Sequence, residues 1–442
     1  MNVLHLHSSD HLGGGGGTVA MERLHLALRK HGVDSRIVAG RKTSPSPYSY
    51  GIRSGRPLKR LESLIGAVTE RAGLKDLDHL DSFGVAGYPA FKAADLLHVH
   101  GTHGFFNYLA LAKLARAKPT LYTLHDMWPL TGHCSYSFGC ERWRLGCGHC
   151  PHLDAHPAVK RDNTRVEWRL KRWLYSRCEL TIVAVSRWIE SIARDGLFSH
   201  YRVEYIPNGI DTSVYRDVDK SVCREALGIP PDKHVLMFVS LRLDDRRKGG
   251  DLLLDALRGL PGHLAKDTVL MVLGDAGHGF DQALGWQVLN LGYVRSDALK
   301  AAAYSAADLF VFPTRADNLP LVLLESAACA TPSVSFRVGG VPEIVRHEQT
   351  GWLAEEGDSE GFLDGIVQLI EQPERRLRLG AASRRLMETE YSEVTNLERH
   401  LALYREILGW HGQLGGRPRS PHRGGDTPPE SDVEDFSPGR VA

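Results

Sequence analysis

The stretch from Ala307 to Val345, ADLFVFPTRADNLPLVLLESAACATPSVSFRVGGVPEIV, predicts a strand, a helix and a second strand in succession. The apolar run from Asp308 to Pro313 is typical of a strand buried in a parallel sheet. Ser333 to Phe336 predicts the next strand, and Gly339-Gly340 opens a loop after it. The stretch therefore predicts the repeating unit of an α/β fold.

The helix between these strands is expected to begin near Leu319 and to end before Thr331. Asp317 or Asn318 can serve as its N-cap, and Pro320 suits a first helical turn because its missing N–H has no partner there anyway. A strand that leads into a helix N-terminus presents free backbone N–H groups and a positive dipole end. Phosphate is the anion such a site is expected to bind.

Two acids eight residues apart, Asp317 and Glu325, lie inside DNLPLVLLESAACATP, and GGVPE follows. This pattern resembles the donor-sugar signature of the retaining nucleotide-sugar glycosyltransferases of family 4. The resemblance implies that Glu325 binds the ribose hydroxyls and that Asp317 meets the transferred sugar. It also implies that the backbone of Asn318, Leu319, Pro320 and Leu321 holds the pyrophosphate. The first acid is usually Glu in that family, and the shorter Asp is expected to affect sugar preference.

Composition is that of a globular enzyme with two domains. The chain has 442 residues, of which 42% are hydrophobic and 24% charged, with a net charge of +1. This length exceeds one ordinary core. The balanced charge gives no argument for nucleic-acid binding. We find no long apolar run and no signal peptide, so a cytoplasmic protein is expected.

The N-terminus predicts a strand from Val3 to His7, a loop from Ser8 to Thr18 containing five glycines, and then a helix. Such an opening lets backbone approach an anion closely. The resemblance implies that Gly15, Gly16 and Gly17 face the donor phosphate and the acceptor. A nicotinamide cofactor is an alternative for such a loop, but the second strand ends in AGRK without the acid that would bind its ribose.

Three further residues are candidates for the donor site. His125 follows the predicted strand from Thr120 to Leu124, where open α/β sheets place ligands, and the family carries a histidine there. Arg242 and Lys248 lie six residues apart after another strand, in a setting where the family uses both cations on the leaving pyrophosphate. Fixed cations can stabilise that charge without a metal. Val294 resembles the position where the family's backbone meets the nucleobase.

Two basic segments are candidates for contact with a membrane surface or a glycan. Residues 58–74 and 161–177 both predict amphipathic helices, the second with interleaved tryptophans. An ordinary solvated helix face is the alternative for each. The expected location is therefore the cytoplasm, with peripheral contact at the inner face of the membrane as a further hypothesis.

Four of the seven cysteines, Cys134, Cys140, Cys147 and Cys150, lie within GHCSYSFGCERWRLGCGHC. The C-x2-C pair suits two thiolates on one metal. A closed structural zinc site is one interpretation, with His133, His149 or His152 able to replace a thiolate. Free buried thiols are the other. No cofactor is expected to be required for catalysis.

The expected fold is α/β of the GT-B type, with two Rossmann-like domains facing across a cleft. Its parts are an acceptor-side domain (1–206), a nucleotide-sugar-binding domain (207–390), helices crossing back to the first domain (391–410) and a disordered tail (411–442). The expected activity is retaining, metal-independent transfer from a nucleotide-diphosphate sugar to a glycan or lipid-linked glycan in cell-surface polysaccharide synthesis. A nucleotide-sugar-binding protein without turnover and a nicotinamide-dependent oxidoreductase are the alternatives.

Overall fold

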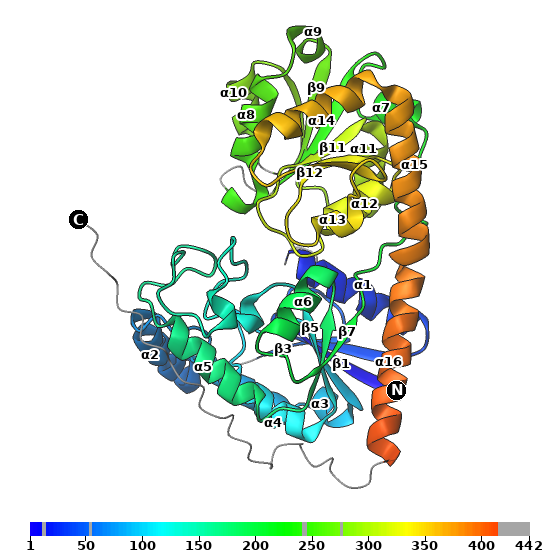
Figure 1. The fold of residues 1–442 in the computed structure, drawn as a ribbon. Coiled ribbons are helices and arrows are strands. Elements are labelled where there is room, and N and C mark those ends of the chain that lie inside the picture. Colours follow the sequence, from blue (N-terminus) through cyan, green and yellow to red (C-terminus); the bar gives the residue numbers. More distant parts are fainter. Residues whose placement is uncertain (11–14, 53–54, 241–244, 275–276, 414–442) are drawn as a thin grey trace, which may run out of the picture.

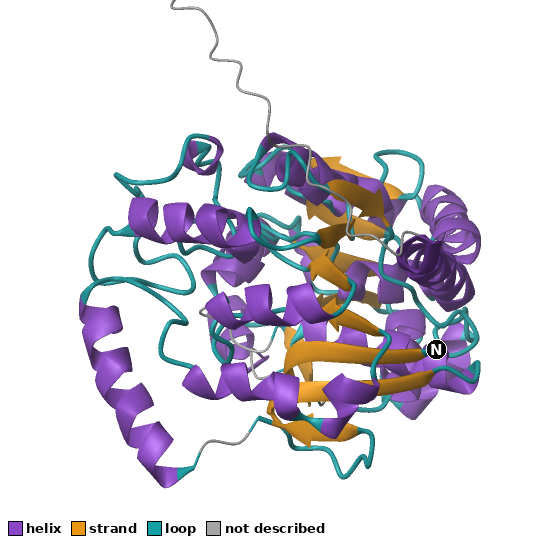
Figure 2. Cartoon of the chain, turned by 90° about the horizontal axis from the view of Figure 1, so that it is seen from below, coloured by secondary structure: helices purple, strands orange, loops and turns teal. Residues whose placement is uncertain are grey.

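Two parallel β-sheets organise the protein. The computed structural model describes residues 1–10, 15–52, 55–240, 245–274 and 277–413. Each sheet is the centre of its own domain, and the two domains are stacked end to end (Figure 1). Helices cover the strands on both faces (Figure 2). This is the arrangement of two Rossmann-like domains, as the sequence predicts.

The first domain carries a sheet of seven described strands. Its elements in chain order are β1 (Asn2–Ser9), α1 (Gly16–Lys30), β2 (Asp34–Arg41), β3 (Ser49–Gly51), α2 (Arg56–Arg71), the 3-10 helix η2 (Leu80–Gly87), α3 (Pro89–Ala93), β4 (Leu96–Val99), α4 (Leu109–Ala117), β5 (Thr120–Leu124), the 3-10 helices η3 (Trp128–Leu130) and η4 (Arg142–Arg144), α5 (Thr164–Tyr175), β6 (Leu180–Ala184), α6 (Arg187–Asp195) and β7 (Arg202–Tyr205). The strand order is β3-β2-β1-β4-β5-β6-β7. From β1 the chain adds strands first on one side of the sheet and then, with β4, on the other. Open α/β sheets bind ligands at such a switch point.

The second domain carries a sheet of six described strands. Its elements are α7 (Lys220–Ala226), β8 (His234–Val239), the 3-10 helix η5 (Arg246–Lys248), α8 (Gly250–Arg258), α9 (Gly262–Ala265), β9 (Thr268–Leu273), α10 (Gly277–Leu284), β10 (Gln287–Gly292), α11 (Asp297–Ala306), β11 (Leu309–Phe312), α12 (Leu321–Ala328), β12 (Ser333–Phe336), α13 (Val341–Ile344), β13 (Gly351–Ala354), α14 (Ser359–Glu371) and α15 (Pro373–Glu390). The order β10-β9-β8-β11-β12-β13 again reverses, between β8 and β11.

The helix α12 differs from its predicted start. It begins at Leu321, after Pro320, and no side chain caps it. The prediction that Asp317 or Asn318 is the N-cap is therefore wrong. Both side chains are engaged by distant parts of the chain, Asp317 by Lys248 and Asn318 by Ser186. Tertiary contacts have overridden the local capping preference.

The last helix, α16 (Glu393–Gln413), returns to the first domain and packs along α1 (Figure 1). Its apolar residues Leu403, Tyr404 and Ile407 join a buried cluster with residues of the first sheet. The Tyr404 hydroxyl lies 2.6 Å from Nδ1 of His98 in β4. The helix reaches three residues into the segment expected to be a tail, because it continues to Gln413. Residues 414–442, the rest of that segment, lie outside the described residues.

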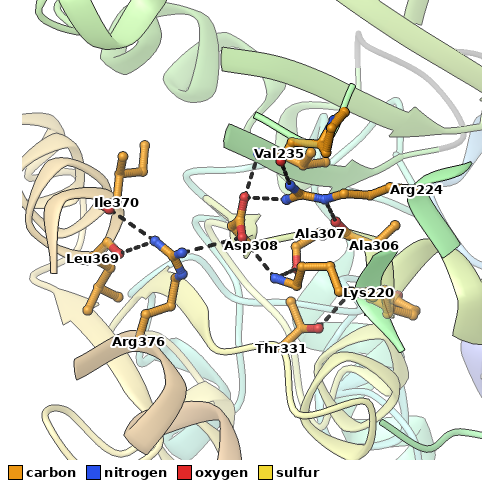
Figure 3. Close-up of polar contacts among 12 residues, drawn as sticks. Lys220, Arg224, Val235, Ala306, Ala307, Asp308, Thr331, Leu369, Ile370 and Arg376 are labelled. Carbon is orange, nitrogen blue, oxygen red and sulfur yellow. Dashed lines mark hydrogen bonds and ion pairs between the residues drawn. The ribbon is translucent and has the colours of Figure 1, made fainter. Parts of the chain in front are cut away.

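A cluster of charged residues around the buried Asp308 holds the start of β11 (Figure 3). Asp308 accepts hydrogen bonds from Lys220 Nζ at 2.8 Å, from Arg224 Nη2 at 2.7 Å and from the backbone N–H of Val235 at 2.9 Å. Arg376 of α15 lies 3.5 Å away. One carboxylate thus joins α7, β8, β11 and α15. Among the helices of the described residues, none has the length and apolar character needed to cross a membrane.

Candidate active site

Asp317 lies between two cations that the loop after β8 supplies. Its Oδ2 atom is 2.9 Å from Lys248 Nζ and 2.7 Å from Arg247 Nη1. Burial by itself raises the pKa of Asp317, but Lys248 and Arg247 outweigh it and the net pKa lies below its ordinary value. Burial and the neighbouring Arg247 lower the pKa of Lys248, while Asp317 opposes this. The group is therefore an ionised carboxylate with two partly exposed cations at a strand end.

Gly339 and Gly340 pack closely against the backbone of Asp317 and Asn318. The backbone N–H of Gly340 donates to the Asp317 carbonyl at 3.2 Å. Gly339 has a φ of 53°, and a Cβ there would collide with the Asp317 carbonyl; one on Gly340 would collide with the Asn318 carbonyl. The Gly-Gly pair of the predicted motif thus has a steric reason. It fixes the turn from which Asp317 and Asn318 project.

Asn318 connects the two domains. Its Oδ1 accepts a hydrogen bond from Ser186 Oγ at 2.5 Å, and its Nδ2 donates to the carbonyl of Leu124 at 3.0 Å. Nearby, Glu343 accepts from the backbone N–H of Trp188 at 3.1 Å. The carboxyl ends of β5 and β6 in the first domain thus face the turn before α12 in the second.

His125 lies at this boundary, against the glycine-rich loop. A Cβ on Gly17 would lie 3.3 Å from His125 Cγ and 3.4 Å from His7 Nε2, tighter than ordinary contacts, whereas one on Gly16 would meet nothing within 4 Å. Gly17 therefore permits close packing on His125, and Gly16 borders open space. Gly15 has a φ of 91° just before α1, which starts at Gly16 inside the predicted loop.

Histidines extend from His125 into the first domain. His125 Nε2 is 3.1 Å from His100 Nδ1, and His100 Nε2 is 2.9 Å from His5 Nδ1. Burial, with smaller contributions from His7 and His400, lowers the pKa of His125 to about 3. His125 is thus a neutral imidazole at pH 7, suited to hydrogen bonding with an uncharged ligand.

Glu325 faces a different partner from Asp317. Its Oε1 is 2.8 Å from Arg23 Nη2, an ion pair that links α12 to α1 of the first domain. Arg23 also donates to the Tyr215 hydroxyl at 3.3 Å, and the Tyr304 hydroxyl lies 3.4 Å from Glu325 Oε2. The two acids of the predicted signature therefore mark two separate polar groups along α12 and the turn before it.

The remaining candidates are placed as follows. Leu319 and Leu321 are buried beside Asn318, and Pro320 precedes α12. Val294 follows β10, is partly buried and packs against the hydrophobic core of the second domain. Arg242 falls outside the described residues.

Arg23, Arg247 and Tyr136 are site residues that the sequence did not single out. Arg247 is next to the predicted Lys248, but Arg23 is separated from Glu325 by 302 positions. The Arg247 guanidinium lies 5.3 Å from the centre of the Tyr136 ring. Tyr136 belongs to the cysteine-rich loop, so that loop of the first domain reaches the Asp317 group of the second. No sequence motif predicted the contact of Arg23 with Glu325 or that of Tyr136 with Arg247.

Three buried histidines are arranged closely enough to be compared with a metal site. His5, His98 and His100 bring possible ligand atoms within 4.8 Å of one another. Hydrogen bonds already engage both ring nitrogens of His98, with Tyr404 and Thr123, and both of His100, with His5 and His125. The group therefore fits a hydrogen-bonded core and not a set of free ligands.

Comparisons with known proteins agree with this geometry. A model described as Glycosyltransferase Family 4 matches residues 14–214, and one described as Glycosyl transferases group 1 matches residues 233–372. A protein of Escherichia coli (strain K12) named "Putative colanic acid biosynthesis glycosyl transferase WcaC" is 27% identical over 280 residues. That match covers 59% of this chain and 64% of WcaC, so it spans less than two thirds of the relative.

Solved structures show the same fold. Sucrose-phosphate synthase from Thermosynechococcus elongatus has a TM-score of 0.67 at 20% identity, covering 93% of this chain and 100% of that one. Anabaena HepE in complex with UDP has a TM-score of 0.65 at 18% identity, covering 92% and 100%. HepE has also been solved with UDP-glucose. These likenesses confirm the predicted GT-B arrangement.

The fold and the two matched models define a class, the GT-B glycosyltransferases. Within that class, the family 4 model matches the first domain and the group 1 model matches the second domain. Both matched models describe transferases, which favours this class over the nicotinamide oxidoreductase.

Proposed function

We propose that this protein transfers a sugar, with retention of anomeric configuration and without a catalytic metal, from a nucleotide-diphosphate sugar to a glycan or lipid-linked glycan. The observation that carries the proposal is the Asp317 group, in which Arg247 and Lys248 flank a carboxylate whose neighbour Asn318 bonds the carbonyl of Leu124, the residue before His125. Cell-surface polysaccharide synthesis is the proposed role, supported by the likeness to WcaC.

The donor is assigned to the second domain. Arg247 and Lys248 would neutralise the diphosphate, Asp317 would meet the sugar, and the turn from Asn318 to Leu321 would offer the backbone N–H groups of Leu319 and Leu321 to the phosphates. Glu325 would bind the ribose hydroxyls, exchanging part of its contact with Arg23 for them. The HepE complexes make UDP-sugars the first donors to test.

The reaction breaks the bond between sugar C1 and the β-phosphate oxygen and forms the bond from C1 to the acceptor oxygen on the same face. The acceptor proton passes to the departing phosphate oxygen, so no carboxylate nucleophile is needed. Negative charge grows on the leaving diphosphate, and fixed cations stabilise that charge most in the transition state. His125, neutral at pH 7, would hydrogen-bond the sugar.

Replacing Glu325 tests the donor site. Glu325→Gln keeps the shape of the side chain but removes its charge. The loss of a charged hydrogen bond to ribose is expected to cost about 1.5–3 kcal/mol, which weakens donor binding about ten- to a hundredfold. Isothermal titration with the donor that raises the melting temperature of the wild type measures this. The exposed Glu406, paired with Arg202 on the surface, supplies the control Glu406→Gln. Equal donor affinity in the wild type and Glu325→Gln would contradict the assignment.

The first domain offers a surface for a membrane-bound acceptor. No residue of α2 is buried, and Leu61, Leu64 and Val68 are 47%, 65% and 61% exposed. The end of α2 adjoins the start of α5, where Asn163 Nδ2 donates to the Ala72 carbonyl at 2.5 Å. An unpartnered apolar ridge at helical spacing is typical of an interfacial helix.

Basic residues lie on α5, whose start adjoins the end of α2. The outer side of α5 and the preceding loop form a hollow lined by four arginines and Trp168; the arginines are Arg144, Arg165, Arg169 and Arg172. Trp173 of α5 is 51% exposed. Arginine clusters bind phosphate and anionic lipid, and exposed tryptophan suits the membrane interface. We therefore assign an acceptor carried by the cytoplasmic membrane surface.

Flotation with liposomes tests this surface. Wild-type protein should float with vesicles containing an anionic phospholipid, and the bound fraction should fall as salt screens the arginines. The double variant Leu61→Ser/Leu64→Ser should lose most of this binding, whereas Leu377→Ser, an exposed leucine of the second domain, should not. Absence of salt-sensitive binding, together with efficient transfer to a small soluble acceptor, would favour a soluble substrate.

A further inference from the structure

The cysteine-rich loop between β5 and α5 brings four thiols to one small hollow. Cys134, Cys140, Cys147 and Cys150 all line it. All seven cysteines of the chain lie among the described residues, and none of them forms a disulfide. The other three, Cys178, Cys223 and Cys329, are buried elsewhere. Residues up to 16 positions apart thus converge without a covalent link between them.

The backbone around the C-x2-C pair is shaped for sulfur ligands. Cys147 and His149 have φ values of 53° and 50°, flanking Gly148 at 83°, so three successive residues are left-handed. The C-x2-C spacing is one that lets two thiolates reach the same metal ion. The backbone N–H of Gly132 donates to Cys147 Sγ at 3.2 Å. A backbone N–H directed at sulfur is a common contact of metal-bound cysteine.

A histidine adjoins the same hollow. His133 Nε2 lies 3.3 Å from Cys150 Sγ, and its Nδ1 lies 3.0 Å from the Pro157 carbonyl oxygen. The ring is buried and held at both nitrogens, so it supports the thiols from one side. Among the described residues, only the three buried histidines near His125 bring three ligand atoms within 4.8 Å. The four sulfurs therefore have to draw closer around an ion.

We propose that Cys134, Cys140, Cys147 and Cys150 bind one structural Zn²⁺ as four thiolates. Four sulfur ligands fill a tetrahedral shell and leave no open position, which assigns the ion to structure and not to catalysis. The proton of each thiol is released when the ion binds. The ion would close the loop in two places, across residues 134–140 and 147–150, and hold both against α5.

The consequence for the active site runs through Tyr136, which lies between the first two ligands. The Arg247 guanidinium, which pairs with Asp317, lies 5.3 Å from the centre of the Tyr136 ring. If zinc closes this loop, it would fix the position of Tyr136 beside Arg247, the partner of Asp317. This second part rests on the proposed function, whereas the zinc site does not.

Metal analysis of the full chain, purified without chelator, tests the site. The expected result is one zinc per chain by mass spectrometry, and loss of most of it in Cys147→Ser and in Cys150→Ser. Cys223→Ser and Cys329→Ser, which alter buried thiols elsewhere, should keep their zinc. His133→Gln should keep it too. Less than about 0.1 zinc per chain, or full zinc in Cys147→Ser, overturns the proposal.

A second measurement uses only the wild-type protein and so tests the site even if the serine variants do not fold. Wild-type protein exchanged with Co²⁺ should show the visible and near-ultraviolet bands of a tetrahedral tetrathiolate site, whatever its glycosyl activity. Bands of three or fewer thiolates overturn the ligand set. In folded, zinc-free protein, turnover should fall about a hundredfold, as in Tyr136→Ala, because an approximately 1 Å misplacement can cost that much. Unchanged turnover in folded zinc-free protein overturns the link to the active site.

Discussion

Replacing Lys248 with alanine should depress turnover about a hundredfold or more. The substitution removes a cation that lies 2.9 Å from Asp317 and that we assign to the leaving diphosphate. The loss of one preorganised charge that acts in the transition state typically has this effect. Steady-state kinetics at saturating donor measures it, since the effect is expected in kcat.

A matched lysine elsewhere controls for the general loss of charge. Lys233 forms an ion pair with Asp267 at the amino ends of β8 and β9, whereas Lys248 follows the carboxyl end of β8, and Lys233→Ala should retain wild-type kinetics. The Lys248→Ala protein must also keep its melting temperature within a few degrees for the comparison to count. A folded Lys248→Ala variant with kcat near that of the wild type would contradict the role of this cation.

Asp308→Asn should destabilise the protein by about 3–5 kcal/mol. The substitution leaves the largely buried Arg224 and Arg376, and the partly exposed Lys220, around a neutral amide (Figure 3). Removing one partner of a buried charge group costs about this much because the remaining charges lose their compensation. Denaturant unfolding, followed by a probe of the second domain, measures the change. Asp255→Asn, in the exposed pair with Arg258, should change stability little.

The same carboxylate gives a pH dependence. Burial raises the pKa of Asp308, but Lys220, Arg376 and Arg224 outweigh it, so the folded-state pKa lies below the ordinary value. A depressed pKa contributes stability above the unfolded value of about 4, and this contribution is lost as the pH falls through the folded pKa. The stability difference between wild type and Asp308→Asn should therefore shrink below pH 4. A difference that is constant with pH would contradict the ionised state.

Several parts of the fold could be predicted because the residues alone determine them. Residues 120–124 and 333–336 form strands at the predicted positions, where short apolar runs are bounded by turn residues. Lys248 and Asp317 were both singled out and lie in contact. The Gly-Gly pair at 339–340 has the tight backbone that the motif indicates.

Other features depend on contacts between distant segments. Asp317 and Asn318 have good capping side chains, but the second domain's cations and the first domain's Ser186 take them instead. Arg23 is one of many helix-surface arginines until the fold places α1 beside α12. Tyr136 lies in a loop without periodicity, and only the stacking of the domains brings it to Arg247.

The anomeric configuration of the sugar released from its donor tests the central claim most directly. Purified protein is incubated with a panel of nucleotide-diphosphate sugars, and proton NMR follows the anomeric signal of the released sugar. The rate is measured with and without EDTA. EDTA is added immediately before the measurement, so that a closed thiolate site still holds its zinc. We predict cleavage of one donor with retained configuration and with an initial rate that EDTA does not change. An inverted product, activity only with added magnesium or manganese, or binding of the donor without any turnover would contradict the account.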